Sequence, residues 1–404
     1  MLLAGGIAGP GARAARPAHG HPAHAHHVLA PVLPAAPSGP PAVAPLAVAD
    51  MPPPPALADQ ASYVLMDAAT GAIIAEKVPD LHWPPASLAK LMAVYLTYQR
   101  IAAGGLKLDQ AVPVSVAAWR TGGSRMFISP ATQVTVDQLL HGLIIDSGND
   151  AAVALAQAIA GTRGSFVRMM NATAARLGLA NTHYTDVDGL PDPAMYSSAR
   201  DIALLSRAIL RRFPQVLRIS ARKHYTFDKI RQRSWNPVLF HDPTVDGLKT
   251  GRTDEAGHCI DATAVRGGRR LIAVVLGGPS WSASTKAIEA LLDYGYQFYT
   301  NATVAAAGRP LGTLTSSRWK QETIAVGAAH DVVRTLPTAA ATSLQTKLLL
   351  DPPQPGGFAK GAVVGRITVS AGGKTIATVP AVALAAAQPA GLVTRLMRSA
   401  RKLL

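Results

Sequence analysis

Strand patterns on both sides of a long helical region constrain the fold of this chain most strongly. Residues 62–78 read as two strands, and helical periods then dominate to about Phe213. Two further strands follow at 259–265 and 271–276. Helices enclosed in this way by distant strands predict an α+β domain over residues 61–300, in which both ends of the segment complete one sheet.

Three short polar motifs occur in a fixed order inside this segment. A serine followed one helical turn later by a lysine is typical of acyl transfer with lysine as general base, when a second polar turn and a Lys-Thr-Gly strand accompany it. Ser-x-x-Lys alone carries little weight because it recurs elsewhere in the chain, whereas Lys-Thr-Gly occurs once. The motifs are Ser87-Leu88-Ala89-Lys90, Ser147-Gly148-Asn149 and Lys249-Thr250-Gly251.

The context of the first motif indicates the start of a buried helix. Two prolines come shortly before Ser87, and apolar residues recur at helical spacing after it. We therefore expect Lys90 one turn after Ser87 on the same face, within reach of its hydroxyl. Burial and the helix dipole both disfavour the charged lysine, which suits a base near neutral pH. A capping serine with a solvated lysine is the alternative reading of this motif alone.

The other two motifs fall on a turn and on a strand. Residues 147–149 separate two helical runs, so a tight turn is expected there, although a helix C-cap followed by an asparagine N-cap has the same pattern. Residues 249–251 precede the two later strands and are expected on a strand edge. A lysine and a threonine there are suited to binding a carboxylate, and Gly251 permits close backbone approach.

Longer segments around these motifs resemble the D-alanyl-D-alanine carboxypeptidases, the low-molecular-weight penicillin-binding proteins. The resemblance lies in residues 85–92, 139–151, 181–201 and 246–257, and it extends over residues 60–385. It implies a β-lactamase/transpeptidase-like catalytic domain followed by a small all-β domain. It further implies that the enzyme removes the terminal D-alanine of a peptidoglycan stem peptide through an acyl-enzyme, that β-lactams bind it, and that no metal or organic cofactor is needed.

The resemblance also implies the catalytic roles. Ser87 would attack the penultimate D-alanine carbonyl after Lys90 takes its proton. Ser147 would relay a proton to the departing D-alanine, and Asn149 would orient the peptide and Lys90.

Substrate binding is implied for the third motif and the residue after it. Lys249 and Thr250 would hold the terminal carboxylate beside Gly251, and backbone N–H groups of Ser87 and Arg252 would stabilise the oxyanion. Family members commonly carry histidine at the Arg252 position, and they often have a later arginine that this chain lacks. Two readings stay open: the Arg252 guanidinium binds the carboxylate, or it points to solvent while only its backbone contributes.

Three alternative functions remain. A D,D-endopeptidase of peptidoglycan cross-links would use the same motifs. A class A β-lactamase deacylates with a glutamate between the second and third motifs, but no glutamate lies between Asn149 and Lys249. A catalytically inactive wall-binding module would not need three intact motifs.

Composition narrows the cellular setting. The net charge of +15 invites a nucleic-acid interpretation, but aromatic residues make up only 5% and the arginines are scattered, so no nucleic-acid partner is expected. A basic surface near an anionic membrane or wall polymer explains the charge better. The single cysteine, Cys259, excludes an intramolecular disulfide, and its apolar strand context predicts a buried thiol.

The regions outside the catalytic segment differ in character. Residues 1–60 are rich in Ala, Pro and His without a sustained period, which predicts a disordered leader with a possible signal remnant at its start. Residues 301–388 alternate in strand fashion and predict the small all-β domain.

Residues 389–404 predict a basic amphipathic helix, which Pro389 and Gly391 should separate from that domain. Such a helix would attach a periplasmic protein peripherally to the anionic surface of the cytoplasmic membrane. Four basic residues lie opposite its apolar arc, which comprises Leu392, Val393, Leu396, Met397, Ala400, Leu403 and Leu404.

Overall fold

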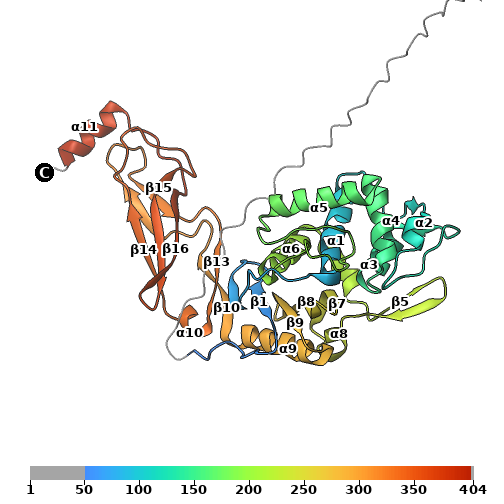
Figure 1. The fold of residues 1–404 in the computed structure, drawn as a ribbon. Helices are drawn as coiled ribbons and strands as arrows, with labels where there is room; N and C mark the ends of the chain where they lie inside the picture. Colours follow the sequence, from blue (N-terminus) through green and yellow to red (C-terminus); the bar gives the residue numbers. More distant parts are fainter. Residues whose placement is uncertain (1–50, 402–404) are drawn as a thin grey trace, which may run out of the picture. The chain divides into compact units, whose positions relative to one another are not determined.

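The structure, a computed structural model, describes residues 51–401, and its first domain is built on a five-stranded antiparallel sheet (Figure 1). The predicted union of distant strands is confirmed, because Ser62 near the start of the domain pairs with Leu276 near its end. The strand order is β2-β1-β9-β8-β7. The strands are β1 (Ser62–Asp67), β2 (Ile73–Lys77), β7 (Val245–Thr253), β8 (Gly257–Arg266) and β9 (Arg269–Gly278).

Helices cover both faces of this sheet. Side chains alternate along β1, so Val64 and Met66 pack among the helices of the middle segment, while Tyr63 and Leu65 pack with α9 (Trp281–Phe298). Cys259 is fully buried, as predicted, and burial raises its pKa to about 12.

The middle segment is mainly helical. Its helices are η1 (Ala86–Ala89), α1 (Lys90–Ala102), α2 (Val116–Trp119), α3 (Val136–Ile144), α4 (Asn149–Ala160), α5 (Arg163–Leu177), α6 (Ala199–Arg212), η2 (Pro214–Val216), α7 (Leu217–Ser220) and α8 (Val238–His241). Two short strand pairs interrupt them: β3 (Ala111–Val112) with β4 (Val134–Thr135), and β5 (His224–Phe227) with β6 (Ile230–Arg233).

A small β-domain follows α9, in agreement with the sequence pattern. Its core surrounds Trp319, Val326, Ile367 and Val369. A five-stranded antiparallel sheet has the order β11-β12-β16-β15-β14, and β10 pairs separately with β13. The elements are β10 (Tyr299–Ala305), β11 (Gly312–Thr315), β12 (Thr323–Gly327), β13 (Val332–Pro337), α10 (Thr338–Ala341), β14 (Leu344–Leu350), β15 (Val363–Ala371) and β16 (Lys374–Ala383).

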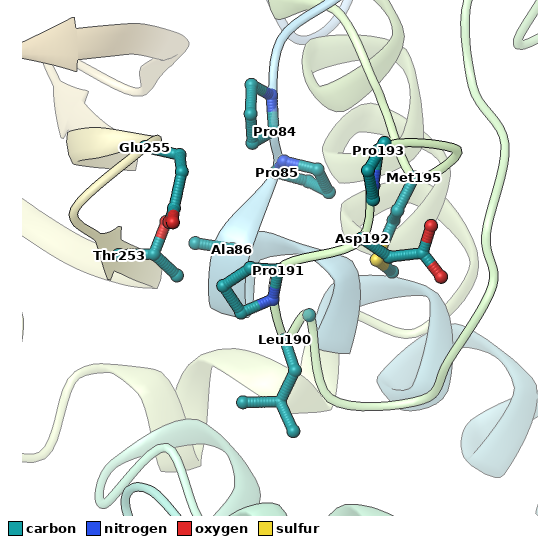
Figure 2. A pocket seen from close by; sticks show the side chains of 11 residues that line it. Pro84, Pro85, Ala86, Leu190, Pro191, Asp192, Pro193, Met195, Thr253 and Glu255 are labelled. Atoms are coloured by element: carbon teal, nitrogen blue, oxygen red, sulfur yellow. The ribbon is translucent and has the colours of Figure 1, made fainter.

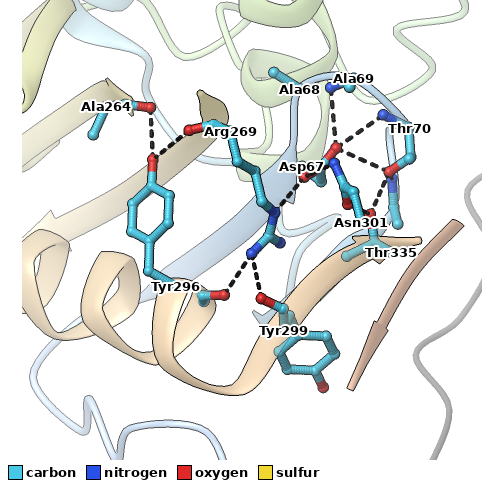
Figure 3. A network of polar contacts seen from close by, with 12 residues as sticks. Asp67, Ala68, Ala69, Thr70, Ala264, Arg269, Tyr296, Tyr299, Asn301 and Thr335 are labelled. Carbon is cyan, nitrogen blue, oxygen red and sulfur yellow. Dashed lines mark hydrogen bonds and ion pairs between the residues drawn. The ribbon is translucent and has the colours of Figure 1, made fainter. Parts of the chain in front are cut away.

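A buried aspartate links the first turn of the sheet to the base of the β-domain (Figure 3). Asp67 accepts hydrogen bonds from Arg269 Nε and Asn301 Nδ2, both at 2.9 Å. Thr70 and Thr335 hydroxyls lie 2.6 Å apart in the same network. Because both oxygens of the Asp67 carboxylate accept hydrogen bonds, the carboxylate is tolerated without access to water.

Two terminal predictions need correction. Most of the predicted leader, with its possible signal remnant, lies outside the described residues, but the disorder predicted up to residue 60 does not hold for 51–60. Tyr294 Oη donates to Pro52 O at 3.1 Å, and Lys77 Nζ donates to Gln60 O at 2.6 Å. These contacts hold the segment against the sheet domain.

The C-terminal helix forms but is not separated from the β-domain. In α11 (Leu392–Arg401), Arg398 donates to the backbone carbonyls of Ser317, Trp319 and Lys320 and pairs with Glu322. Pro389 also forms a β-bridge with Trp319, so the connector itself adheres to the domain. Among residues 51–401, no helix is both long and apolar enough to span a bilayer.

Candidate active site

Ser87 and Lys90 lie at the start of α1 in the predicted arrangement. Ser87 belongs to η1, Lys90 begins α1, and Lys90 Nζ donates to Ser87 Oγ at 2.7 Å. Ala86, directly before the serine, has φ of 46°, which is strained for a residue with a side chain. The chain therefore turns sharply just before Ser87 and brings its hydroxyl to the lysine.

The environment of Lys90 favours the neutral amine. Its side chain is fully buried, and this burial lowers its pKa to about 8, although Asp188, Asp186 and Asp150 favour the charged form. The lysine is then still mainly charged at pH 7, but its neutral form is far more populated than that of an exposed lysine and can accept a proton from Ser87.

A turn after α5 supplies the second partner of Lys90. Lys90 Nζ donates to Asp188 O at 2.8 Å. The Asp186 carboxylate shapes this turn by accepting hydrogen bonds from the backbone N–H groups of Asp188, Gly189 and Leu190. Gly189 has φ of 84°, and a Cβ there would overlap Ala86 O, so only glycine lets the turn lie against η1.

The second motif forms the predicted turn between α3 and α4. Ser147 has φ of 58°, and its backbone oxygen accepts a hydrogen bond from Ser124 Oγ at 2.7 Å. Asn149 Nδ2 donates to Gly122 O at 2.7 Å, whereas Asn149 Oδ1 is buried without a hydrogen-bond partner within the described residues. The Lys90 amine donates hydrogen bonds to Ser87 and Asp188. The Asn149 amide does not contact it through these bonds, because its Nδ2 donates to Gly122 O.

The third motif lies on β7, the edge strand of the sheet, as predicted. Lys249 Nζ is buried and donates to Ser147 Oγ at 3.0 Å and to Thr250 O at 2.8 Å. Burial, assisted by the charge of Lys90, holds the pKa of Lys249 well below its ordinary value. A Cβ at Gly251 would lie 2.9 Å from Pro85 O and 3.1 Å from Ser87 N, so glycine permits the close approach of β7 to η1.

Arg252 differs from the buried residues of the site. Its side chain is about half exposed and pairs with Asp254 at 2.9 Å on the β7–β8 turn. This geometry agrees with the reading in which the guanidinium faces solvent and only the backbone of Arg252 lies beside the serine.

Sequence reasoning gave no role to several residues that position the site. Asp188 lies in segment 181–201 of the family resemblance without a role of its own, and no sequence pattern singles out Ser124 or Gly122. Asp150 is fully buried and accepts hydrogen bonds from the backbone N–H groups of Met126, Phe127 and Ile128, which fixes the loop beside Ser147. The only signal in the sequence was the position of Asp150 directly after the second motif.

The site holds two serine–lysine pairs: Ser87 with Lys90 at a helix start, and Ser147 in a turn with Lys249 on an edge strand. This arrangement is typical of serine acyl-transfer enzymes with a lysine base. Comparison with known proteins agrees. The D-alanyl-D-alanine carboxypeptidase family matches residues 49–280, and the family of the penicillin-binding protein 5 C-terminal domain matches residues 299–388. The chain therefore belongs to the D-alanyl-D-alanine carboxypeptidase family.

Curated relatives and solved structures cover most of the chain. It is 36% identical to D-alanyl-D-alanine carboxypeptidase DacA of Escherichia coli, over 81% of this chain and 83% of that protein. It is 38% identical to DacD of Salmonella typhimurium, over 88% and 93%. The crystal structure of penicillin-binding protein 5 from Haemophilus influenzae superposes with a TM-score of 0.76 at 34% identity, covering 83% of this chain and 99% of that one.

Proposed function

We propose that this protein removes the terminal D-alanine of peptidoglycan stem peptides by serine acyl transfer, and that β-lactams acylate the same serine. The observation that carries the proposal is the 2.7 Å contact between Ser87 Oγ and the buried amine of Lys90. Family membership supports the D-Ala-D-Ala substrate.

In the proposed acylation, Lys90 takes the hydroxyl proton while Ser87 Oγ attacks the carbonyl carbon of the scissile bond. The resulting oxyanion lies at the backbone N–H groups of Ser87 and Arg252, where β7 passes η1. Ser147 relays the proton that Lys90 took from Ser87 to the departing D-alanine nitrogen, and water then hydrolyses the acyl-enzyme to release the shortened peptide. Asn149 Oδ1, buried without a partner, is suited to accept an N–H of the bound peptide.

The terminal carboxylate is held by Lys249 and Thr250. In the free protein, burial and Lys90 depress the pKa of Lys249. An arriving carboxylate places a negative charge beside the amine and favours its ammonium form. Substrate binding therefore stabilises the charge that binds it.

The test is mass spectrometry after exposure to penicillin, followed by an assay of D-alanine release from a pentapeptide. Wild type should gain one covalent penicillin per chain and release one D-alanine per peptide. Ser87→Ala should do neither while keeping the wild-type circular dichroism spectrum. Release of D-alanine by this variant at near the wild-type rate would remove the mechanism.

The adduct should also persist. No glutamate lies between Asn149 and Lys249 to activate a deacylating water. Loss of the adduct at about 1 s⁻¹ or faster, a typical turnover rate, would instead indicate a β-lactamase.

A periplasmic location with peripheral membrane attachment through α11 completes the proposal. Leu392 and Met397 are 74% and 62% exposed, while Arg398 on the same helix is held by the β-domain. The apolar residues are thus available to a bilayer although this arginine is not.

Deletion of residues 391–404 should release the protein from vesicles containing anionic lipid without changing hydrolysis of a small soluble peptide. High salt should weaken binding of the full chain without abolishing it, because apolar burial remains. Unchanged vesicle binding after the deletion would contradict attachment through this helix.

A further inference from the structure

The charged residues near the active site differ between the two ends of β7. At its end, a pocket of about 220 Å³ opens beside η1 (Figure 2), and the charged residues in its lining are Asp192 and Glu255, both acidic. At its start, Asn236 Nδ2 donates to Gly247 O at 3.3 Å, which ties the segment after the β5–β6 hairpin to the strand. This hairpin carries the opposite charge.

The hairpin and the residues before it are strongly basic. Residues 218–233 contain six lysines and arginines and one acidic residue, Asp228. We define the hairpin surface as the exposed side chains of Lys223, His224, Lys229, Arg231 and Arg233. Within the part of the chain that the structure describes, none of these side chains forms an ion pair. The hairpin surface therefore presents cations that the protein itself does not neutralise.

The inner face of the hairpin fixes it to the helical segment. Tyr225 stacks on His141 with ring centroids 5.0 Å apart, and its cross-strand partner Gln232 donates from Nε2 to Arg125 O at 3.0 Å. Arg125 directly follows Ser124, whose hydroxyl holds the Ser147 turn. The hairpin, which projects from the sheet domain in Figure 1, is thus anchored next to the active site.

The outer face carries the arginines. Side chains alternate along a strand, so Arg231 and Arg233 lie on the face opposite Gln232, where their cross-strand partners are Thr226 and His224. The Arg233 guanidinium lies over the Phe240 ring at 3.9 Å from its centroid, and Lys223 Nζ lies 5.6 Å from the same centroid. Stacking holds the guanidinium by its flat face and leaves its N–H edges available for a carboxylate.

We propose that the hairpin surface binds an anionic strand of the cell-wall polymer next to the strand being processed, through the carboxylates of its stem peptides. The inference rests on the proposed function, which brings the protein into contact with that polymer. It adds a second contact outside the active site. A polymer repeats its carboxylates, so several of these cations can bind one strand at the same time.

The chemistry of the outer face favours this partner over an anionic bilayer. Interfacial binding needs an exposed apolar face beside the basic residues. Here the cross-strand neighbours of the arginines are polar, and the cations of Lys223 and Arg233 cover Phe240. The exposed Ile230 belongs to the inner face, on the same side of β6 as Gln232. A water-exposed polyanion therefore suits this surface better than a membrane.

The test is sedimentation of the full chain with lipid-free peptidoglycan, after acylation by penicillin has blocked Ser87. Wild-type binding should weaken with added salt, and Lys223→Gln/Arg231→Gln/Arg233→Gln should weaken it about tenfold at low salt, as expected for a few exposed charge contacts. The unacylated variant should release D-alanine from a soluble pentapeptide at the wild-type rate. If it does not fold, Lys229→Gln/Arg231→Gln serves instead, because it leaves the stack on Phe240 intact.

A matched control removes the same charge elsewhere. Lys347, Arg366 and Lys374 are exposed on β14, β15 and β16, and Lys347→Gln/Arg366→Gln/Lys374→Gln should bind peptidoglycan like wild type. Equal binding by wild type and the hairpin variant, or an equal loss in the control, would overturn the inference. A loss seen only with vesicles of anionic phospholipid would also overturn it and assign the surface to the membrane.

The soluble assay separates this inference from the function on which it rests. Failure of wild type to release D-alanine from the pentapeptide would refute the proposed function, and that measurement involves no polymer. Weakened peptidoglycan binding with unchanged pentapeptide hydrolysis is the result that supports the hairpin surface. Slow pentapeptide hydrolysis by a folded hairpin variant would show that the hairpin supports the active site instead, and would overturn the inference.

Discussion

The sheet domain and the β-domain of this protein bury different kinds of side chain. The sheet domain buries charged groups that include Lys90, Lys249, Asp146, Asp188 and Asp261. Between residues 299 and 394, the structure buries no charged or polar side chain, and the core is formed by apolar residues alone.

This difference indicates that the sheet domain buries ionisable groups for its chemistry, whereas the core of the β-domain is built for stability. Burial of a charge is unfavourable unless a partner compensates it, so an apolar side chain is the simpler choice for stability. Burial raises the pKa of Asp146 and of Asp261 to about 7 and lowers that of Lys90 to about 8. Perturbed groups of this kind collect at functional sites. The β-domain follows the ordinary rule for a stable core.

The largest effect should come from replacing a buried charge that the chemistry needs. Lys90→Arg keeps a positive charge but cannot deprotonate at working pH, so acylation by penicillin should slow by at least about 10⁴-fold. The measurement is the rate of covalent labelling by a fluorescent penicillin. Lys229→Arg on the exposed β5–β6 turn is a control that should label normally. Labelling of Lys90→Arg within tenfold of wild type would mean that the buried lysine is not the base.

A core substitution in the β-domain should affect stability alone. Trp319 is fully buried, and Trp319→Ala should cost about 3–5 kcal/mol of folding free energy in that domain. Thermal unfolding should show an earlier transition, while penicillin labelling at low temperature stays within about twofold of wild type. If Trp319→Ala does not fold, the milder Val369→Ala serves the same comparison. Slow labelling by a folded variant would show that the β-domain core supports the site.

The smallest effect should be a shift in pH dependence. The base must be neutral, so acylation should rise with pH through about 8, the pKa of Lys90. The Asp188 carboxylate raises that pKa, and Asp188→Asn should therefore move the rising limb to lower pH by about one unit. Asp261→Asn is the matched control, since Asp261 is equally buried but its charge is not among those that act on Lys90. An unmoved limb in Asp188→Asn would contradict this role.

Local pattern was enough to place the three motifs. The apolar period after Ser87 predicted a helix start, and Gly148 between two helical runs predicted the turn. The strand-edge position of Lys249 was expected because two strands follow it in the sequence. Each of these features depends on residues close together in the chain, which is why sequence periodicity captures them. The predicted union of the first and last strands is confirmed by the pairing of β1 with β9.

Contacts between distant segments could not be predicted in the same way. The Asp188 turn meets Lys90 across 98 residues of chain, and no local period indicates that approach. Arg398 meets Glu322 only because the β-domain brings its loop beside α11.

The sequence by itself identified the residues that we propose carry the chemistry and the elements that hold them. Tertiary structure alone decided how those residues are charged, because the pKa of Lys90 depends on complete burial and on three carboxylates from other segments. It also decided where the pocket opens, since Pro191 on a loop and Thr253 at the end of β7 line it from positions far apart in the chain. Burial and long-range approach are properties of the packed chain, and no short stretch of sequence contains them.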